Sequence, residues 1–406
     1  MYIHRTIETS VKRASKQFPV LLLTGARQVG KTTLLRHLAC EGREYVTLDD
    51  PLSRSLANED PRLFLSRFPP PVLIDEIQYA PGLLPYLKMV VDDNPSTGSF
   101  WLTGSQPFHL MHGVSESLAG RIAVIQLMGL SQQEIRYTGN TQPFRPTRRH
   151  LEGVESSNFC PSPGEIYEQI FRGGLPALIA KPETDRDLFF GSYVQTYLQR
   201  DIRDLARVAD ENAFLRFLRA VAARTGQLLN LADLARDVDI APNTAKSWLS
   251  ILEVSGVIHL LEPYHTNLTN RLVKAPKIHF LDTGLCAYLC RWMSPETIEA
   301  GAMAGAFLES WAISEVLKSF RHNGCQDPLY FYRDRDRREI DLLIVSDGMI
   351  HPIEIKHTAT PRRSHVQSFN YLNKLDLPIG PGALLNLSQT PMPLSDNAWS
   401  FPLGLL

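Results

Sequence analysis

The amino-acid sequence predicts an α/β protein in three parts, and the order of its apolar and polar stretches supports this. Residues 1–137 alternate short apolar runs with amphipathic stretches, which is typical of a parallel sheet covered by helices. Residues 213–283 contain two helical stretches around a tight turn, followed by two strands, which indicates a winged helix. Residues 284–406 predict helix, hairpin, strand and helix. Between the first two parts, we expect a loop or linker at 138–165, rich in Pro, Ser, Thr and Asn, and a helical lid at 166–212.

Composition excludes several classes of protein. The chain has 406 residues with a net charge of −1, so any contact with nucleic acid must come from local basic patches. No apolar run is long enough to span a bilayer, and the first residues lack the apolar core of a secretory signal. The five cysteines have no metal-ligand spacing, which favours a reducing compartment. We therefore expect a cytoplasmic protein with no membrane partner.

The first part contains five apolar runs that predict buried strands. They are Val20–Leu23, Tyr45–Leu48, Val72–Ile74, Phe100–Leu102 and Val124–Leu127. The amphipathic stretches between them supply the crossover helices that parallel strands require.

A phosphate-binding loop follows the first of these strands. The motif GARQVGKT has the spacing of a P-loop (Walker A) and lies between a strand and a helix. Its glycines expose backbone N–H groups to phosphate, Lys31 would reach the β- and γ-phosphates, and the Thr32 hydroxyl would ligate Mg²⁺. The predicted nucleotide-binding residues are Gly25, Ala26, Arg27, Gln28, Val29, Gly30, Lys31, Thr32 and Thr33. The alternative is a glycine-containing turn that binds nothing.

Two later strand ends complete this predicted site. PVLIDEIQ is an apolar strand that ends in Asp75, suited to the Mg²⁺ shell, and Glu76, suited to a general base that polarises water. FWLTGSQ ends in hydroxyl groups, and Thr103 or Ser105 is a candidate sensor of the γ-phosphate. The alternatives are an acidic helix cap and an ordinary polar turn.

These segments, together with SLAGRIAVIQLMGLS, FRGGLPAL and IEIK, carry a resemblance that spans nearly the whole chain. The chain resembles the bacterial and archaeal AAA-family ATP-binding proteins whose C-terminal domain has no assigned function and belongs to the restriction-endonuclease-like, or PD-(D/E)XK, superfamily. The resemblance implies ATP hydrolysis with ATP and Mg²⁺ as ligands, a homo-oligomer such as a hexamer, and coupling to DNA binding or remodelling, including branched DNA. The rival function is a nucleotide-dependent switch acting on protein partners, with the C-terminal domain as a docking module.

The resemblance gives meaning to two further segments. GGLPAL is similar to the Gly-x-Pro element of signal-transducing ATPases, which places Pro176 near the adenine; the alternative is a helix that begins with proline. Arg121 is a candidate arginine finger acting across a subunit boundary, as are Arg200 and Arg203. Each of these arginines is also compatible with a surface ion pair.

The helix-turn-helix offers few groups for reading DNA. Its second helix places Asn243, Lys246 and Ser247 where base-facing residues are expected, with Trp248 buried. Acidic residues lie nearby, so a lid that packs on the ATPase core is the alternative to a DNA reader.

The C-terminal hairpin predicts a second functional site. In EIDLLIVSDGMIHPIEIK, Asp347-Gly348 is a type I′ turn signal, which pairs Ser346 with Met349 and sets Asp341 opposite Glu354. Facing like charges destabilise a strand pair. Because Lys356 shares their face, the three residues match the metal-binding acids and catalytic lysine of the restriction-endonuclease-like fold.

Other residues extend or weaken that hypothesis. Glu309 lies in an apolar arc of the helix AGAFLESWAISEVLKSF, where an acid needs a partner, and it is the candidate third metal ligand. Glu339 would face Lys356, so a plain cross-strand ion-pair ladder is the alternative. Strand alternation would put Arg333, Arg335 and Arg337 on one side, either to hold phosphates or as a solvated edge.

Overall fold

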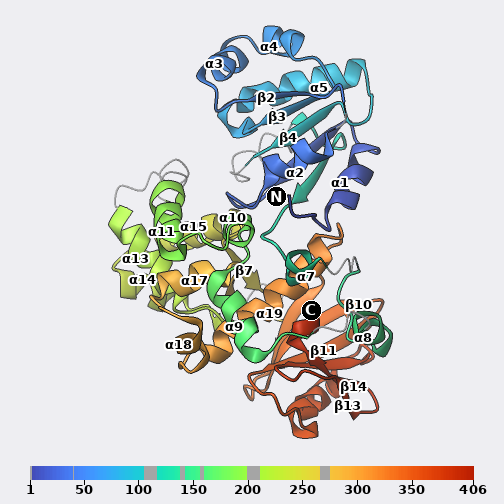
Figure 1. The fold of residues 1–406 in the computed structure, drawn as a ribbon, viewed down its shortest axis with the longest axis vertical. Coiled ribbons are helices and arrows are strands. Elements are labelled where there is room, and N and C mark those ends of the chain that lie inside the picture. The colour runs from blue at the N-terminus through green and yellow to red at the C-terminus, as the bar shows by residue number, and fades with distance from the viewer. Residues whose placement is uncertain are drawn as a thin grey trace. The chain divides into compact units, whose positions relative to one another are not determined.

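The structure, a computed structural model, describes residues 2–39, 41–104, 117–137, 142–155, 160–198, 211–265 and 275–406. It divides into two compact units (Figure 1). Unit 1 contains Met1–Leu130, Val254–Gly256 and Arg321–Gly324, and unit 2 contains Ser131–Glu253, Val257–Phe320 and Cys325–Leu406. No helix in these described ranges is long and apolar enough to cross a membrane.

Unit 1 contains a five-stranded parallel sheet in the order β2-β3-β4-β1-β5. The strands are β1 (Val20–Thr24), β2 (Glu44–Thr47), β3 (Val72–Asp75), β4 (Phe100–Thr103) and β5 (Ile122–Gln126). The five predicted strands are thus confirmed, with ends shifted by one or two residues. The helices lie around this sheet: α1 (Glu8–Ser15), α2 (Lys31–Leu38), α3 (Pro51–Glu59), α4 (Pro61–Arg67) and α5 (Leu84–Asp93).

The expectation that all five strands are buried is wrong for the two edge strands. Strands β1, β3 and β4 are buried along their whole length, whereas β5 is only half-buried and Val124 is 42% exposed. β2, at the opposite edge, begins with two exposed residues. An apolar run predicts the strand, but its place in the sheet decides how much of it is covered.

Unit 2 begins with helices. They are α7 (Gln132–Arg136), α8 (Arg148–Glu155), α9 (Pro163–Arg172), α10 (Pro176–Ala180), α11 (Arg186–Tyr193), a π-helical turn at Val194–Leu198 and α13 (Glu211–Ala222). Helix α9 starts at a capping box, in which Ser162 and Glu165 satisfy each other's backbone N–H groups. The expected helical character of 166–212 is confirmed for its described residues.

The predicted loop at 138–165 is wrong in part, because it contains α8. Phe144 and Leu151 are each 2% exposed. The Phe144 ring contacts Phe401 at 5.1 Å between centroids, and its backbone N–H donates to the Ser319 hydroxyl at 2.9 Å. The Pro- and Ser-rich composition hid a short apolar stripe that packs on the C-terminal part of the chain.

The middle of unit 2 has the predicted order of helices and strands. It contains β6 (Gln227–Leu228), α14 (Leu231–Val238), α15 (Pro242–Val254), β7 (Ile258–Leu261) and β8 (Lys277–Phe280). The strands form a sheet in the order β6-β8-β7. The expected pairing of the last two is confirmed, since Ile258 pairs with Phe280 in an antiparallel ladder.

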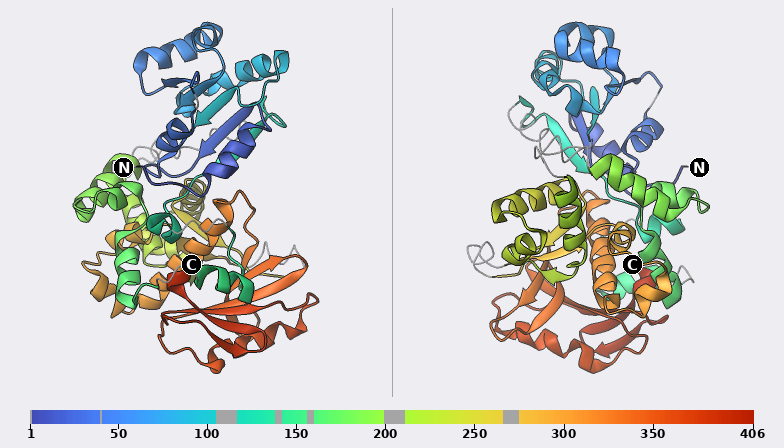
Figure 2. Two further views of the ribbon diagram at one scale, coloured as in Figure 1. Left: turned by 45° about the vertical axis from the view of Figure 1, so that its right-hand side comes forward. Right: turned by 90° about the vertical axis from the view of Figure 1, so that its left-hand side faces the viewer.

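The C-terminal part of unit 2 has a long helix beside a six-stranded mixed sheet, coloured orange to red in Figure 2. Its helices are α17 (Thr283–Leu289), α18 (Pro295–Glu299) and α19 (Ala304–Arg321), with 3₁₀ segments at Arg363–Lys374 and Leu403–Leu405. Its strands are β9 (Leu329–Arg333), β10 (Glu339–Ser346), β11 (Met349–Lys356), β12 (Gly382–Asn386), β13 (Met392–Ser395) and β14 (Ala398–Pro402), in the order β13-β14-β12-β11-β10-β9.

The predicted hairpin register is confirmed. Ser346 pairs with Met349, and the two loop residues have φ values of 54° for Asp347 and 74° for Gly348. Both positive φ values are those of a type I′ turn, which Asp-Gly favours. A local dipeptide therefore fixes the pairing of two eight-residue strands.

Candidate functional site

The P-loop lies between β1 and α2 in unit 1. Helix α2 begins after Gly30, whose φ of 94° favours glycine, and Gly25 has a φ of 137° with Leu127 so close that a Cβ would lie 2.1 Å from its carbonyl oxygen. Lys31 is 6% exposed, and its ammonium donates to the Gly25 and Ala26 carbonyls at 3.0 and 2.9 Å. The loop thus holds its lysine beneath the turn that is expected to surround phosphate.

The remaining predicted loop residues line the same turn. Ala26 and Val29 are buried, Arg27 and Gly30 are half-buried, and Gln28 and Thr33 are exposed. Gln28 has a φ of 61°, which is uncommon for a residue with a side chain. Arg5 braces the turn by donating to the Val29 and Met128 carbonyls at 2.9 and 2.7 Å. No motif in the sequence indicated this role for Arg5.

Asp75, the last residue of β3, meets the P-loop as predicted. Asp75 is 5% exposed and accepts the Thr32 hydroxyl at 2.8 Å, the Tyr45 hydroxyl at 3.0 Å and the Thr103 hydroxyl. A threonine hydroxyl beside a carboxylate is a donor set that suits Mg²⁺. Thr103 also accepts the Glu76 backbone N–H at 3.1 Å, so it ties the two acids together.

Glu76 itself has an unusual backbone. Its φ of 59° is left-handed, and its carboxylate accepts the Gln78 side-chain amide. Left-handed non-glycine residues are rare and gather at functional sites, where the surroundings hold them in place. Glu76 directly follows Asp75, the last residue of β3, and precedes the 3₁₀ turn Ile77–Tyr79.

Tyr45, on the neighbouring strand β2, was missed by sequence reasoning. Burial and the Asp75 carboxylate raise the pKa of Tyr45 above its ordinary value, so the phenol stays a hydrogen-bond donor to Asp75. Arg36 stacks over the Tyr45 ring at 4.8 Å. Tyrosine is common in strands, and no sequence pattern separates Tyr45 from a tyrosine that only packs. The contact with Asp75 is therefore visible only in the folded structure.

Several predicted residues lie elsewhere or outside the described ranges. Ser105, Arg200 and Arg203 are outside the described residues. Arg121 makes a two-point ion pair with Asp92, at 2.5 and 3.1 Å. Pro176 opens helix α10, which is the geometry of the alternative interpretation.

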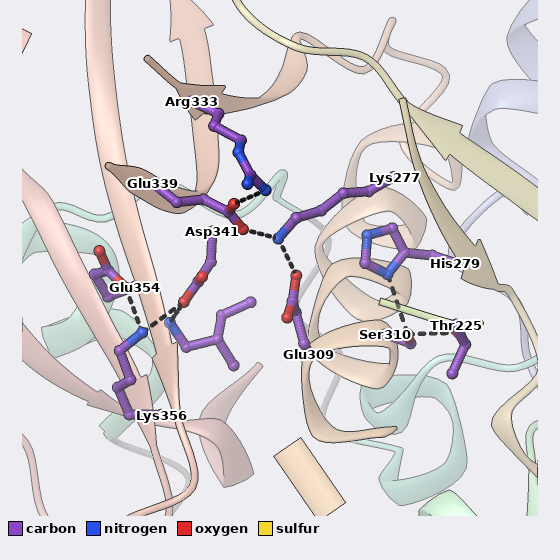
Figure 3. Close-up of polar contacts among 11 residues, drawn as sticks. Thr225, Lys277, His279, Glu309, Ser310, Arg333, Glu339, Asp341, Glu354 and Lys356 are labelled. Carbon is purple, nitrogen blue, oxygen red and sulfur yellow. Dashed lines mark hydrogen bonds and ion pairs between the residues drawn. The ribbon is translucent and has the colours of Figure 1, made fainter. Parts of the chain in front are cut away.

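The C-terminal hairpin brings together the three residues predicted there. The Lys356 ammonium lies 3.1 Å from Asp341 Oδ2 and 2.6 Å from Glu354 Oε2 (Figure 3). Asp341 Oδ2 also accepts the Ile355 backbone N–H at 2.8 Å, and Ser368 donates to Glu354. Two carboxylates on neighbouring strands therefore share one lysine.

A bulge in the sheet explains how Asp341 reaches this position. The β10–β9 register shifts between Ile340 and Leu343, and the β10–β11 ladder ends at the Leu342–Ile353 pair. The Asp341 side chain then takes the Ile355 N–H that a strand carbonyl would have used. Bulges redirect side chains in this way and are common beside functional sites.

Electrostatics at the hairpin follow from burial of like charges. Glu354 is 3% exposed, and burial together with the Asp341 carboxylate raises the pKa of Glu354 to about 8, although Lys356 opposes this. Burial, the largest single effect, would raise the pKa of Asp341, but Lys356, Lys277 and the hydrogen bonds that Asp341 makes with Glu354 and the Ile355 N–H together lower it. One carboxyl therefore retains a proton at neutral pH, as expected when two acids face each other without a second cation.

The predicted third acid, Glu309, has a different partner. It accepts from Lys277 of β8 at 2.8 Å, and Lys277 also lies 2.6 Å from Glu339 Oε1 (Figure 3). Burial raises the pKa of Glu309 to about 7 against the effect of Lys277, and Asp341 raises it further. Lys277 was missed because it lies 32 residues from Glu309 in the sequence and opens a strand that looked structural.

The alternative of a plain ladder between Glu339 and Lys356 is wrong in this structure. Glu339 pairs with Lys277 and, at 3.1 Å, with Arg333, while Lys356 pairs with Asp341 and Glu354. The expected alternation of three arginines also fails. β9 ends at Arg333, and the following residues form a turn in which Arg337 has a φ of 64°.

Among the described residues, one group of His, Cys, Asp or Glu side chains has three ligand atoms within 4.8 Å of one another: His4, Glu8 and His37. Asp341, Glu354 and Glu309 do not form so compact a group. The His4 and His37 side chains are exposed, and Glu8 is fixed by the Tyr2 hydroxyl at 2.9 Å. The two histidines are far apart in the sequence, so no spacing signal indicated this group.

Helix α15, the candidate DNA reader, presents the three predicted polar residues to solvent. Asn243, Lys246 and Ser247 of α15 are exposed, and Trp248 is 5% exposed, packed against Phe214 and Phe217. The burial of Trp248 is therefore confirmed. The acids nearby pair with arginines: Asp233 with Arg236 at 2.8 Å, and Asp237 with Arg224.

Three family models match the chain. Residues 17–136 match the model described as AAA domain, 164–296 match Domain of unknown function (DUF8612), and 304–406 match Domain of unknown function (DUF4143). The P-loop, β3 and β4 all lie in the AAA match, and the hairpin lies in the DUF4143 match. The fold and the P-loop motif agree with an AAA-type P-loop ATPase domain at the N-terminus.

Whole-chain relatives and solved structures are also similar. Among solved structures, the Walker-type ATPase PABY2304 of Pyrococcus abyssi is 18% identical with a TM-score of 0.44, covering 70% of this chain and 94% of that one. A point variant of RuvB from Thermotoga maritima is 18% identical with a TM-score of 0.31, covering 63% and 87%. The uncharacterized proteins Mb2031c of Mycobacterium bovis and Rv2008c of Mycobacterium tuberculosis are each 30% identical over 400 residues, covering 98% of this chain and 83% of theirs. The chain therefore belongs to the family of Mb2031c and Rv2008c, and it carries an AAA domain followed by regions that match two domains of unknown function.

Proposed function

We propose that the chain is a Mg²⁺-dependent ATPase whose hydrolysis at the P-loop is coupled to binding or remodelling DNA. The observation that carries the first half is the contact between the Thr32 hydroxyl and Asp75 at 2.8 Å, directly beside Lys31 and Glu76. In this proposal, Lys31 binds the β- and γ-phosphates, and Thr32 and Asp75 hold the Mg²⁺. When bound, Mg²⁺ neutralises charge on the phosphate oxygens. Glu76 accepts a proton from the attacking water, and Thr103 fixes the position of both acids.

Coupling to DNA is the second half of the proposal. We interpret α14, α15, β7 and β8 as a winged helix, and α15 exposes Asn243 and Lys246 to solvent. Exposed Arg335, Arg337 and Arg338 follow β9 in the C-terminal part. Since net charge is −1, these local groups must supply the attraction to phosphate.

DNA binding by the full chain separates this proposal from a switch that acts on protein partners. We expect an affinity for DNA that falls as salt rises, and Lys246→Ala should reduce the slope of log affinity against log salt by about 1. Lys181→Ala, an exposed lysine outside α15, is the matched control. An affinity for DNA too weak to detect even at low salt would instead favour the switch, with the helix pair as a lid and the C-terminal domain as a docking module.

For the hairpin, we propose a divalent metal site of the restriction-endonuclease-like kind. Asp341 and Glu354 are its ligands, the Ile355 carbonyl is a further oxygen donor, and Lys356 orients or activates a water. The pKa of about 8 at Glu354 supports this, because a metal ion would supply the positive charge that the two acids lack. Cleavage of DNA is a separate claim: it requires the metal and Lys356 to act on a bound strand.

We also propose that the active form is a homo-oligomer, such as a hexamer. This rests on the AAA domain, with Arg121, which pairs with Asp92 in this structure, as the candidate finger that would act on the ATP of a neighbouring subunit. Light scattering with a non-hydrolysable ATP analogue should give a mass that is a multiple of 45.7 kDa. A monomer whose specific rate of hydrolysis does not depend on protein concentration would contradict the proposal.

A further inference from the structure

Lys277 is a buried lysine at an unusual place in unit 2. It is 4% exposed and opens β8, the central strand of the three-stranded sheet, yet its ammonium reaches the acids of the C-terminal domain. A buried ammonium without partners is strongly unfavourable, so this degree of burial requires compensating anions. The anions are Glu309 of α19 at 2.8 Å and Glu339 of β10 at 2.6 Å, and neither is adjacent to β8 in the sequence (Figure 3).

The ammonium is surrounded as a metal ion would be. Two carboxylate oxygens from different elements converge on one nitrogen, and the Phe331 ring lies 5.6 Å away on the apolar side. Carboxylate oxygens from several elements are the ligands that divalent cations take in proteins. The second oxygen of Glu339 lies 3.1 Å from the Arg333 guanidinium. Lys277 and Arg333 therefore fix the orientation of this carboxylate together.

The backbone fixes Lys277 in this position. Lys277 pairs with Leu228 on one side and Leu261 on the other. Just beyond Leu261, the chain joins the six-stranded sheet: Phe331 donates to the Glu262 carbonyl at 3.0 Å, and Tyr264 donates to the Phe331 carbonyl at 2.7 Å. The two sheets are thus hydrogen-bonded to each other, and the lysine is held at a set distance from β9 and β10.

The charges of the cluster divide into two groups. Lys356 is shared by Asp341 and Glu354, and Lys277 is shared by Glu309 and Glu339. Lys356 is 41% exposed at its side chain and can move away when a cation arrives, whereas Lys277 is enclosed. Asp341 and Glu354 can therefore accept a divalent ion in place of Lys356. Glu309 and Glu339 already have a fixed cation, the Lys277 ammonium.

We propose that Lys277 takes the place of a second divalent cation, so that the C-terminal site binds one ion rather than two. The inference deepens the metal site proposed above and rests on it for the first ion. It also makes the site composite: residues 304–406 supply the acids, and β8, outside that segment, supplies the fixed cation. Lys277 is a positioning residue, because it acts by holding Glu309 and Glu339.

Counting bound Mn²⁺ on the full, nucleotide-free chain tests the proposal. All variants carry Asp75→Asn, so that the P-loop acid does not contribute. Lys277→Met removes the ammonium but keeps most of the side-chain volume, and it should bind one more Mn²⁺ per chain than the parent, between Glu309 and Glu339. Lys277→Arg keeps the charge and should bind the same number as the parent.

Two further variants keep the test interpretable. Lys318→Met is the matched control: Lys318 is also buried, and its ammonium lies 2.7 Å from Glu315, one turn away on the same helix, so no ion should be gained. Lys277→Met can fail to fold in metal-free buffer, because it leaves two half-buried acids without their cation. The double variant Lys277→Met with Glu309→Gln removes the ammonium and one carboxylate together. It should fold and bind the same number of Mn²⁺ ions as the parent.

The outcomes separate the inference from the function on which it rests. A gain of one ion in Lys277→Met relative to the parent supports the inference, whatever the parent binds. An equal or smaller number overturns it, as does a gain of the same size in Lys318→Met or in the double variant. No ion in the parent would instead contradict the proposed metal site at Asp341 and Glu354, and the change on removing Lys277 would still decide the role of Lys277.

Discussion

Glu76→Gln should bind ATP with little change and hydrolyse it roughly 10²-fold or more slowly, because the amide cannot accept the proton of the attacking water. The geometry favours a selective effect. Thr103 donates to Asp75 and accepts from the Glu76 backbone rather than from its side chain, so replacing the Glu76 side chain should leave the Thr32–Asp75 contact intact. Lys31→Ala should instead weaken nucleotide binding, since it removes the ammonium from the loop.

The measurement is single-turnover hydrolysis beside equilibrium binding of a fluorescent ATP analogue. Glu59→Gln is the control for loss of a carboxylate in the same unit, because Glu59 is exposed at the end of α3 and accepts locally from the Ser55 hydroxyl at 2.6 Å. A normal rate in Glu76→Gln would remove Glu76 from the role of general base. Equal losses of binding in both Glu76→Gln and Lys31→Ala would show that Glu76 supports the fold of the loop instead.

Asp341→Asn should abolish Mn²⁺ binding at the hairpin while leaving the free energy of unfolding unchanged or higher in metal-free buffer. The amide can still accept the Ile355 N–H, and it relieves the repulsion that, together with burial, raises the pKa of Glu354 to about 8. A residue kept for stability does not behave in this way. If the domain cleaves DNA, the cut should depend on Mg²⁺ or Mn²⁺ and should vanish in Lys356→Ala.

Asp334→Asn is the structural comparison in the same domain. Asp334 pairs with Lys374 at 2.9 Å and accepts the Arg338 N–H at 3.0 Å, so its loss should lower stability slightly and leave metal binding unchanged. Denaturant unfolding with and without Mn²⁺ gives both quantities. A clear loss of stability in metal-free Asp341→Asn, with no ion bound by the parent, would assign Asp341 and Glu354 to an ordinary ion-pair network.

Features encoded by neighbouring residues could be predicted from the sequence. The P-loop follows from glycine spacing between a strand and a helix, and the hairpin register follows from Asp347-Gly348, whose φ values select the turn. The same local logic placed Asp75 and Glu76 at the end of β3. In each case, the physical cause lies within about ten residues of the chain.

Features that depend on distant segments could not be predicted. Lys277, Glu309 and Glu339 meet only because Tyr264 and Phe331 join two sheets through their backbones. The burial of β5 was predicted wrongly, because an apolar sequence does not show whether its strand lies at the edge or in the middle of the sheet. Helix α8 was hidden because its packing partners, Phe401 among them, lie in the last strands of the chain.

Coupling between ATP hydrolysis and DNA is decided by the rate of hydrolysis with and without DNA. The full chain should be assayed alone and with single-stranded, duplex and junction DNA at low salt, with Glu76→Gln as the blank. At least one DNA form should raise the rate of the parent, the increase should fall as salt rises, and Lys246→Ala should reduce it. A parent that hydrolyses ATP at one rate whatever DNA is present would contradict coupling to DNA and would favour the nucleotide switch.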